Sequence, residues 1–128
     1  MEIETQALTN CEIAPDGDVI SLGFVDSDGK PAIIRLSLSQ TGALAMTLPG
    51  LIDRALQARF RDKSLRYAYP LESWAIEQST DCKHGMMTLK TFDGFSVCFS
   101  LRRKQQSELG EVLVAIAELE SKAAMRAN

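Results

Sequence analysis

Residues 28–51 read DGKPAIIRLSLSQTGALAMTLPGL, and residues 93–116 read DGFSVCFSLRRKQQSELGEVLVAI. Each stretch opens with an Asp-Gly pair, which favours a tight hairpin turn between two strands. A strand-like apolar run follows in each, and apolar residues then recur at helical spacing. A constant shift of 65 residues superposes the two stretches and pairs Leu44 with Leu109. The sequence therefore predicts that one strand–helix pattern occurs twice.

Two further strands are predicted before each Asp-Gly pair. Residues 3–13 and 20–24 alternate apolar and polar positions in the first half of the chain, and residues 71–76 and 87–89 do so in the second half. This period of two is typical of half-buried strands. The internal repeat is thus a unit of three strands and one helix.

We predict an α+β protein of one domain over residues 1–128, built from two tandem βββα units. Unit 1 covers about 1–62, unit 2 covers about 66–122, and a short polar tail covers 123–128. A three-stranded sheet with one helix buries little surface alone, so the units are expected to share a core about a pseudo-two-fold axis. We expect one antiparallel sheet layer packed on two helices, with two small sheets as the alternative.

The first helix carries both a start signal and an interruption. Ser39 or Thr41 is a plausible N-cap residue, because a side-chain oxygen there accepts a backbone N–H of the first turn. Pro49 and Gly50 interrupt the helical pattern. We expect a kink at this point, or a new helix that begins at Pro49.

Composition places the chain among ordinary globular proteins. It is 45% hydrophobic and 24% charged, with a net charge of −3. The three cysteines, Cys11, Cys82 and Cys98, have irregular spacing and are read as reduced thiols. The start of the chain has no targeting signal and no stretch is apolar enough to span a bilayer. We expect a cytoplasmic protein without a membrane partner.

One short segment combines groups that can carry chemistry. Asp81, Cys82 and His84 stand within four residues, and His84 is the single histidine. A structural zinc site needs four ligands, and a nucleophile needs an orienting group besides its base. The sequence has neither a second ligand pair nor a nucleophile elbow, and it lacks the glycine-rich phosphate loops. We expect no metal and no cofactor; enzymatic activity stays open, with its absence favoured.

A second segment, 54–69, interleaves basic and aromatic residues, which suits single-stranded nucleic acid because cations neutralise phosphates and rings stack on bases. A basic run after the last predicted strand could extend it. The negative net charge argues against nucleic acid, and basic residues also help to end helices. The candidate nucleic-acid-binding residues are Arg54, Arg59, Phe60, Arg61, Lys63, Arg66, Tyr67, Tyr69, Arg102, Arg103 and Lys104.

The order of elements is similar to that of Pur-alpha and Whirly proteins, which duplicate or assemble strand-rich units that end in a helix. Those units have four strands, whereas three are predicted here. The resemblance is one of topology and implies single-stranded nucleic-acid binding without assigning any residue to it.

The absence of catalytic groupings and the duplicated pattern favour one function class over the others. We expect a non-enzymatic protein-interaction module that binds a protein partner or forms a homo-oligomer, such as a dimer. Single-stranded nucleic-acid binding through segment 54–69 is the alternative.

Overall fold

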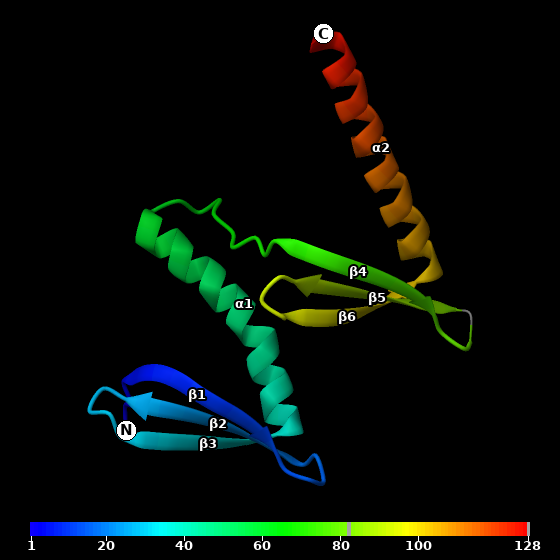
Figure 1. Cartoon of the computed structure of the whole chain (residues 1–128). Helices are drawn as coiled ribbons and strands as arrows, with labels where there is room; N and C mark the ends of the chain where they lie inside the picture. Colours follow the sequence, from blue (N-terminus) through cyan, green and yellow to red (C-terminus); the bar gives the residue numbers. More distant parts are fainter. Residues whose placement is uncertain (82, 128) are drawn as a thin grey trace. The chain divides into compact units, whose positions relative to one another are not determined.

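A computed structural model describes residues 1–81 and 83–127 of the chain (Figure 1). Three strands and a helix are followed by three strands and a helix, which confirms the α+β class. The elements are β1 (Thr5–Ile13), β2 (Val19–Asp26), β3 (Pro31–Ser37), α1 (Leu38–Phe60), β4 (Leu71–Gln78), β5 (His84–Thr91), β6 (Ser96–Arg102) and α2 (Arg103–Ala127). Contacts within the chain separate two compact units, unit 1 (Met1–Tyr67) and unit 2 (Ala68–Asn128). Whether these units form one domain stays a prediction.

The strands form two three-stranded antiparallel sheets, ordered β1-β2-β3 and β4-β5-β6. Among the described residues, no strand of one sheet pairs with a strand of the other. The single sheet layer that we expected is therefore not formed, and the alternative of two small sheets is observed. The connections explain this result: each strand pairs with its chain neighbour, and the third strand leads directly into a helix, so the next strand starts a new ladder.

Both Asp-Gly turns have the predicted hairpin geometry. The Gly29 N–H donates to the carbonyl of Asp26 at 3.0 Å, and the Gly94 N–H donates to the carbonyl of Thr91 at 3.2 Å. Both glycines have positive φ, 81° and 92° respectively, a conformation that side chains with a Cβ rarely adopt. The two hairpins are thus built by the same local chemistry.

The first strand of each sheet is irregular. In β1 the register with β2 shifts between Leu8 and Cys11, and in β4 the register with β5 shifts between Leu71 and Ser73. Such a shift marks a β-bulge, which leaves a residue unpaired and increases the local twist. Both β1 and β4 are edge strands of their sheets.

Helix α1 begins earlier than predicted. Its N-cap is Ser37, not Ser39 or Thr41. The Ser37 hydroxyl accepts the Gln40 N–H at 3.1 Å and the Gln40 side chain accepts the Ser37 N–H at 3.0 Å, which makes a complete capping box. The helix then runs through Pro49 to Phe60 as one element, so no new helix starts at Pro49.

Helix α2 has only half of this cap. The Gln105 side chain accepts the Arg102 N–H at 3.0 Å, as Gln40 does in α1. Arg102 has no side-chain hydroxyl to accept the Gln105 N–H, so the second hydrogen bond of a capping box is not possible here. At its other end α2 continues to Ala127, through the residues expected to form a polar tail. Within the described residues, neither helix has the long apolar run that a membrane crossing requires.

In each unit, the helix covers only a small part of the apolar face of the sheet. Strand alternation places Ile20 beside Ile13 and Leu36 in unit 1, and Trp74 beside Leu89 in unit 2. Within the described residues of each unit, helix α1 contacts β2 and β3, α2 contacts β5 and β6, and each helix runs away from its sheet after its start (Figure 1). Among the described residues no hydrophobic side chain is buried. The core expected for a chain of this length is therefore incomplete within each unit.

Candidate functional site

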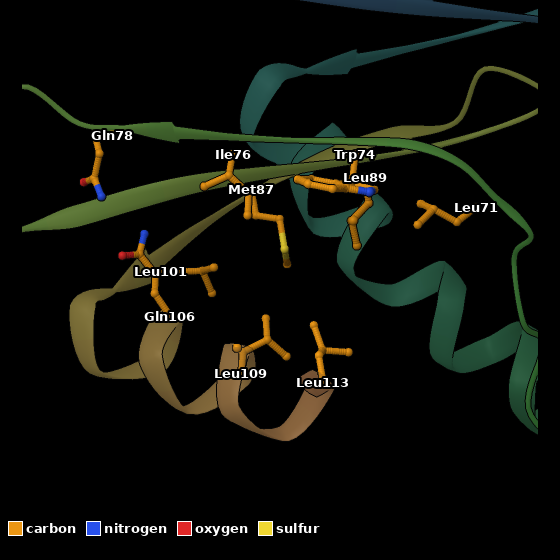
Figure 2. A pocket seen from close by; sticks show the side chains of 11 residues that line it. Leu71, Trp74, Ile76, Gln78, Met87, Leu89, Leu101, Gln106, Leu109 and Leu113 are labelled. Atoms are coloured by element: carbon orange, nitrogen blue, oxygen red, sulfur yellow. The ribbon is translucent and has the colours of Figure 1, made fainter. Parts of the chain in front are cut away.

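A hollow of unit 2 lies between its sheet and the first turns of α2, and we call it the unit-2 cleft (Figure 2). Its volume is about 480 Å³. Every second residue of the strands points into it, together with α2 residues at helical spacing. Its walls are Leu71, Trp74, Ile76, Gln78, Met87, Leu89, Leu101, Gln106, Leu109, Gly110 and Leu113.

The cleft is apolar except for two amide side chains, and Gln106 reaches into its end. A Cβ on Gly85 would collide with Gln106 Nε2, so the glycine leaves the space that this amide occupies. Gln106 Nε2 is buried and has no hydrogen-bond partner within the described residues. An unsatisfied buried donor costs about 1–3 kcal/mol. Gln106 thus closes one end of the cleft, with its amide nitrogen packed against Gly85.

The corresponding positions of unit 1 lack this arrangement. The shift of 65 residues matches Gly85 with Ile20 and Gln106 with Thr41. Thr41 bonds locally, because its hydroxyl donates to the carbonyl of Ser37 at 2.9 Å. The sequence left open whether a pocket lies between sheet and helices, and it did not identify the residues of the unit-2 cleft. The available signal was a glycine inside a strand, which often marks a close approach of other atoms.

The basic-aromatic segment is gathered at the end of α1 in unit 1. Arg54, Arg61 and Lys63 line a shallow hollow of about 440 Å³ together with Gln57 and Ala58. Three of the predicted cations therefore meet at one place. Several positive side chains around one hollow attract an anion, because their electric fields add.

Backbone geometry explains how the chain after α1 folds back. Arg61 is the C-cap residue, with φ of 51°, and its N–H donates to the carbonyl of Gln57. The Gln57 side chain donates to the carbonyl of Leu65 at 2.9 Å, and the Tyr67 N–H donates to Asp53 Oδ1 at 2.8 Å. Segment 61–67 is thereby fixed against the last turns of the helix.

The other predicted nucleic-acid residues do not join the basic hollow. The Arg59 guanidinium lies 5.7 Å from the centre of the Phe60 ring, and Arg66 is exposed. Tyr69 belongs to unit 2, where its ring stacks on Phe95 at 5.3 Å. The structure also places Tyr67 in unit 1, at the end of the folded-back segment, and the basic run of residues 102–104 in unit 2.

A carboxylate stands beside these cations in the chain. Asp62 accepts the Ser64 hydroxyl at 2.6 Å and the Ser64 N–H at 3.0 Å. The hydroxyl, followed by the N–H, holds the pKa of Asp62 below its usual range. The negative charge is therefore retained at any ordinary pH and offsets part of the positive charge of Arg61 and Lys63.

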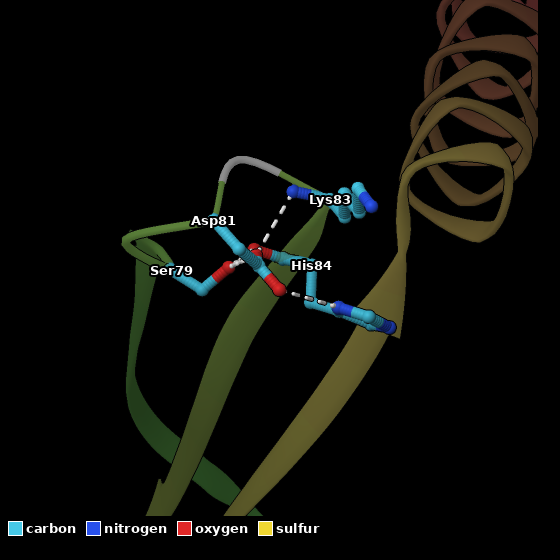
Figure 3. Close-up of polar contacts among 4 residues, drawn as sticks. All are labelled: Ser79, Asp81, Lys83 and His84. Carbon is cyan, nitrogen blue, oxygen red and sulfur yellow. Dashed lines mark hydrogen bonds and ion pairs between the residues drawn. The ribbon is translucent and has the colours of Figure 1, made fainter.

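The loop with Asp81 and His84 is braced by hydrogen bonds (Figure 3). The Ser79 hydroxyl donates to Asp81 Oδ1, the Lys83 N–H donates to the same oxygen at 3.0 Å, and His84 Nδ1 lies 3.4 Å from Asp81 Oδ2. The Ser79 hydroxyl and then the Lys83 N–H lower the pKa of Asp81 to about 2. The ionised Asp81 carboxylate therefore stabilises the turn between β4 and β5 by accepting these hydrogen bonds.

The predicted metal or nucleophile grouping in this loop includes Cys82, which lies outside the described residues. Of the residues that are described, no three His, Cys, Asp or Glu side chains gather where they could hold a metal ion. Cys11 and Cys98 are free thiols in exposed positions.

Comparison of this chain with protein-family models, with curated proteins and with solved structures found no match.

Proposed function

We propose that this protein is a non-enzymatic protein-interaction module that works in the cytoplasm by self-association. The observation that supports it is the exposed apolar surface of each unit: Ile13 of unit 1 is 72% exposed and Trp74 of unit 2 is 66% exposed, although both belong to apolar sheet faces. Exposed apolar faces of this kind are typical of interfaces, because burying apolar surface contributes about 25 cal/mol per Å² to the free energy of association. A second copy of the chain supplies surface of the same kind.

The internal repeat is part of this proposal. Two βββα units that descend from one duplicated unit would carry similar faces, and similar faces can pack on one another. The support is local: the Asp-Gly turns and the Gln40 and Gln105 caps make the same hydrogen bonds at positions 65 residues apart.

Sedimentation equilibrium of the purified chain tests the proposed self-association. We expect a dimer or a larger closed oligomer, and a urea midpoint that rises with protein concentration because association stabilises the folded state. A monomer whose unfolding midpoint is independent of concentration would refute the proposal. An unrelated protein of similar length that unfolds as a monomer serves as the control for concentration effects.

A second function, binding of single-stranded nucleic acid, is favoured by one observation: Arg54, Arg61 and Lys63 surround the same hollow. Fluorescence polarisation of a labelled oligonucleotide at several salt concentrations tests it. Three phosphate contacts predict a slope of about −2 for log affinity against log salt. Substitution of these three residues by Ala should remove the binding, and Arg35→Ala, on β3, is the control.

A further inference from the structure

The basic hollow of unit 1 gathers three cations that no carboxylate pairs with. Arg54, Arg61 and Lys63 line it together with Gln57 and Ala58, and all five residues belong to unit 1. The ion pairs found among the described residues lie in unit 2, so none of them neutralises these cations. Like charges that are held close together repel one another, and an anion bound between them relieves the repulsion.

The backbone conformation of Arg61 is unusual for its residue type. Arg61 caps α1 with φ of 51°, and in the part of the chain that the structure describes it is the one residue besides glycine with positive φ. Glycine is common at such a helix end, because it has no Cβ to strain this conformation. The chain therefore carries a guanidinium group where the backbone alone favours glycine. Strain of this kind is typical of functional positions.

The segment that follows α1 is held against the helix before any ligand arrives. The carbonyl of Gln57 accepts the N–H groups of Arg61 and Asp62, the latter at 3.1 Å. The Gln57 side chain also donates to the carbonyl of Leu65 at 2.9 Å. These bonds fix the backbone on both sides of Lys63, so an anion that binds here does not have to order the segment first.

Ala58 leaves the space between the cations open. Arg54, Ala58 and Arg61 are spaced four and three residues apart, which places them on one side of the helix end. The methyl group of Ala58 is too short to cross the hollow, and the amide of Gln57 is bonded to Leu65. The hollow thus has positive charge around it and no acidic side chain in its lining.

We propose that this hollow binds a phosphate group that carries about two negative charges, namely inorganic phosphate or a phosphomonoester. Three cations match such a dianion better than the single charge of a phosphodiester, and arginine binds phosphate oxygens through parallel N–H donors. The proposal shares its hollow with the nucleic-acid alternative but does not rest on it, because the backbone of a nucleic acid consists of diesters.

Titration of the full chain with three small ions at constant ionic strength tests the charge preference. The probes are inorganic phosphate, methyl phosphate and dimethyl phosphate, and heteronuclear NMR follows the backbone amides. We expect inorganic phosphate and methyl phosphate to shift the signals of residues 54–63 saturably and with similar dissociation constants. Dimethyl phosphate should bind about 5-fold more weakly, the factor of one exposed ion pair.

Two arginine variants form a matched pair for the location of the site. Arg54 and Arg59 are both exposed residues of α1, but Arg54 lines the hollow and Arg59 does not. Arg54→Ala should weaken phosphate binding about 5-fold, whereas Arg59→Ala should leave it unchanged. Ala58→Glu adds a carboxylate inside the hollow and should abolish the saturable shifts, and it keeps a residue that favours helix.

Arg61→Gly separates phosphate binding from the ordinary role of a cation at a helix end, where it stabilises the helix. Glycine adopts positive φ freely, so without phosphate this variant should unfold at the same temperature as the parent chain or higher. It should bind phosphate about 5-fold more weakly. A lower unfolding temperature with unchanged phosphate affinity would overturn the proposal, because Arg61 would then act on the helix alone.

The remaining outcomes also decide between the two uses of the hollow. Equal affinity for the three ions, equal losses in Arg54→Ala and Arg59→Ala, or no saturable shift with any ion would each overturn the proposal. Binding of the labelled oligonucleotide without binding of inorganic phosphate would overturn it and leave the nucleic-acid alternative standing. Binding of inorganic phosphate without the oligonucleotide would support it and remove that alternative.

Discussion

Units 1 and 2 have the same order of elements but differ in their helices. Helix α1 has a complete capping box and a long uncharged stretch, whereas α2 has half a cap and charged residues along its length, including an ion pair of 3.9 Å between Lys104 and Glu108. The sheet of unit 2 forms a cleft with its helix that contains a buried amide, and the matched positions of unit 1 do not. The two units are therefore not interchangeable: α2 has charged residues that tolerate water on one side, whereas the uncharged stretch of α1 is suited to enclosure by other protein.

The largest expected effect comes from a charge in the unit-2 cleft. Leu113→Asp should weaken self-association by about 10²- to 10⁴-fold for each carboxylate that is buried, because a buried, unpaired carboxylate costs about 3–5 kcal/mol. Sedimentation equilibrium measures the change. Val114→Asp is the matched control, since Val114 is 58% exposed and outside the cleft, against 59% for Leu113. Equal losses for the two variants would contradict the special role of the cleft.

Substitutions at the matched positions 49 and 114 test the two helices directly, because the shift of 65 matches Pro49 with Val114. Val114→Pro should lower the free energy of unfolding by about 3 kcal/mol, through the lost hydrogen bond and the clash with the preceding turn. Thermal unfolding followed by circular dichroism measures this loss.

Pro49→Ala should instead raise the helical stability of α1. The gain should be smaller than the loss of about 3 kcal/mol expected for Val114→Pro, because α1 already runs through Pro49. If Val114→Pro left the free energy of unfolding unchanged, the two helices would tolerate an internal proline equally well, which would contradict the proposed difference between them.

A smaller difference is expected at the two helix caps. Ser37→Ala removes a hydroxyl that accepts the Gln40 N–H, and it should lower the free energy of unfolding by about 1 kcal/mol. Arg102→Ala should change stability little, because only the Arg102 backbone takes part in its cap. Urea unfolding curves of both variants make the comparison, and similar losses would show that the hydroxyl is irrelevant.

The smallest effect is a pH dependence from the loop of unit 2. The pKa of Asp81 is lowered to about 2 by the Ser79 hydroxyl and the Lys83 N–H, below its ordinary value of 3.8. A depressed pKa contributes stability that is fully present above about pH 4 and is lost as the pH falls towards 2. Urea midpoints between pH 2 and pH 6 should therefore show a small decline that Asp81→Asn lacks. A parallel decline in the variant would assign the effect to other groups.

Local features of the fold were predictable because their causes are local. The Asp-Gly turns require glycine at positive φ, and the strands follow from alternation over a few residues. The start of α1 was misplaced because Ser37 both ends β3 and caps the helix, and nothing in the pattern marks that double role. Pro49 was read as an interruption, yet a proline removes only one hydrogen bond and the rest of the helix can continue.

Non-local features were not predictable from one sequence. The pairing of strands into two sheets depends on which edges meet, and hydrophobic periodicity does not contain that information. The cleft depends on Gly85 and Gln106 lying against one another although they are 21 positions apart. Of the nucleic-acid candidates, Arg54, Arg61 and Lys63 line one hollow of unit 1, because the segment after α1 folds back on the helix, whereas Tyr69 and residues 102–104 belong to unit 2.

The irregular edge strands β1 and β4 have a consequence for strand pairing between separate chains. Open apolar sheet faces with straight edges would favour endless stacking of strands, as in cross-β assemblies. The register shifts in β1 and β4 twist one edge of each sheet and interrupt the row of backbone groups that an added strand would need. A newly made chain can therefore keep its apolar faces open to a partner without offering these two edges as templates for aggregation.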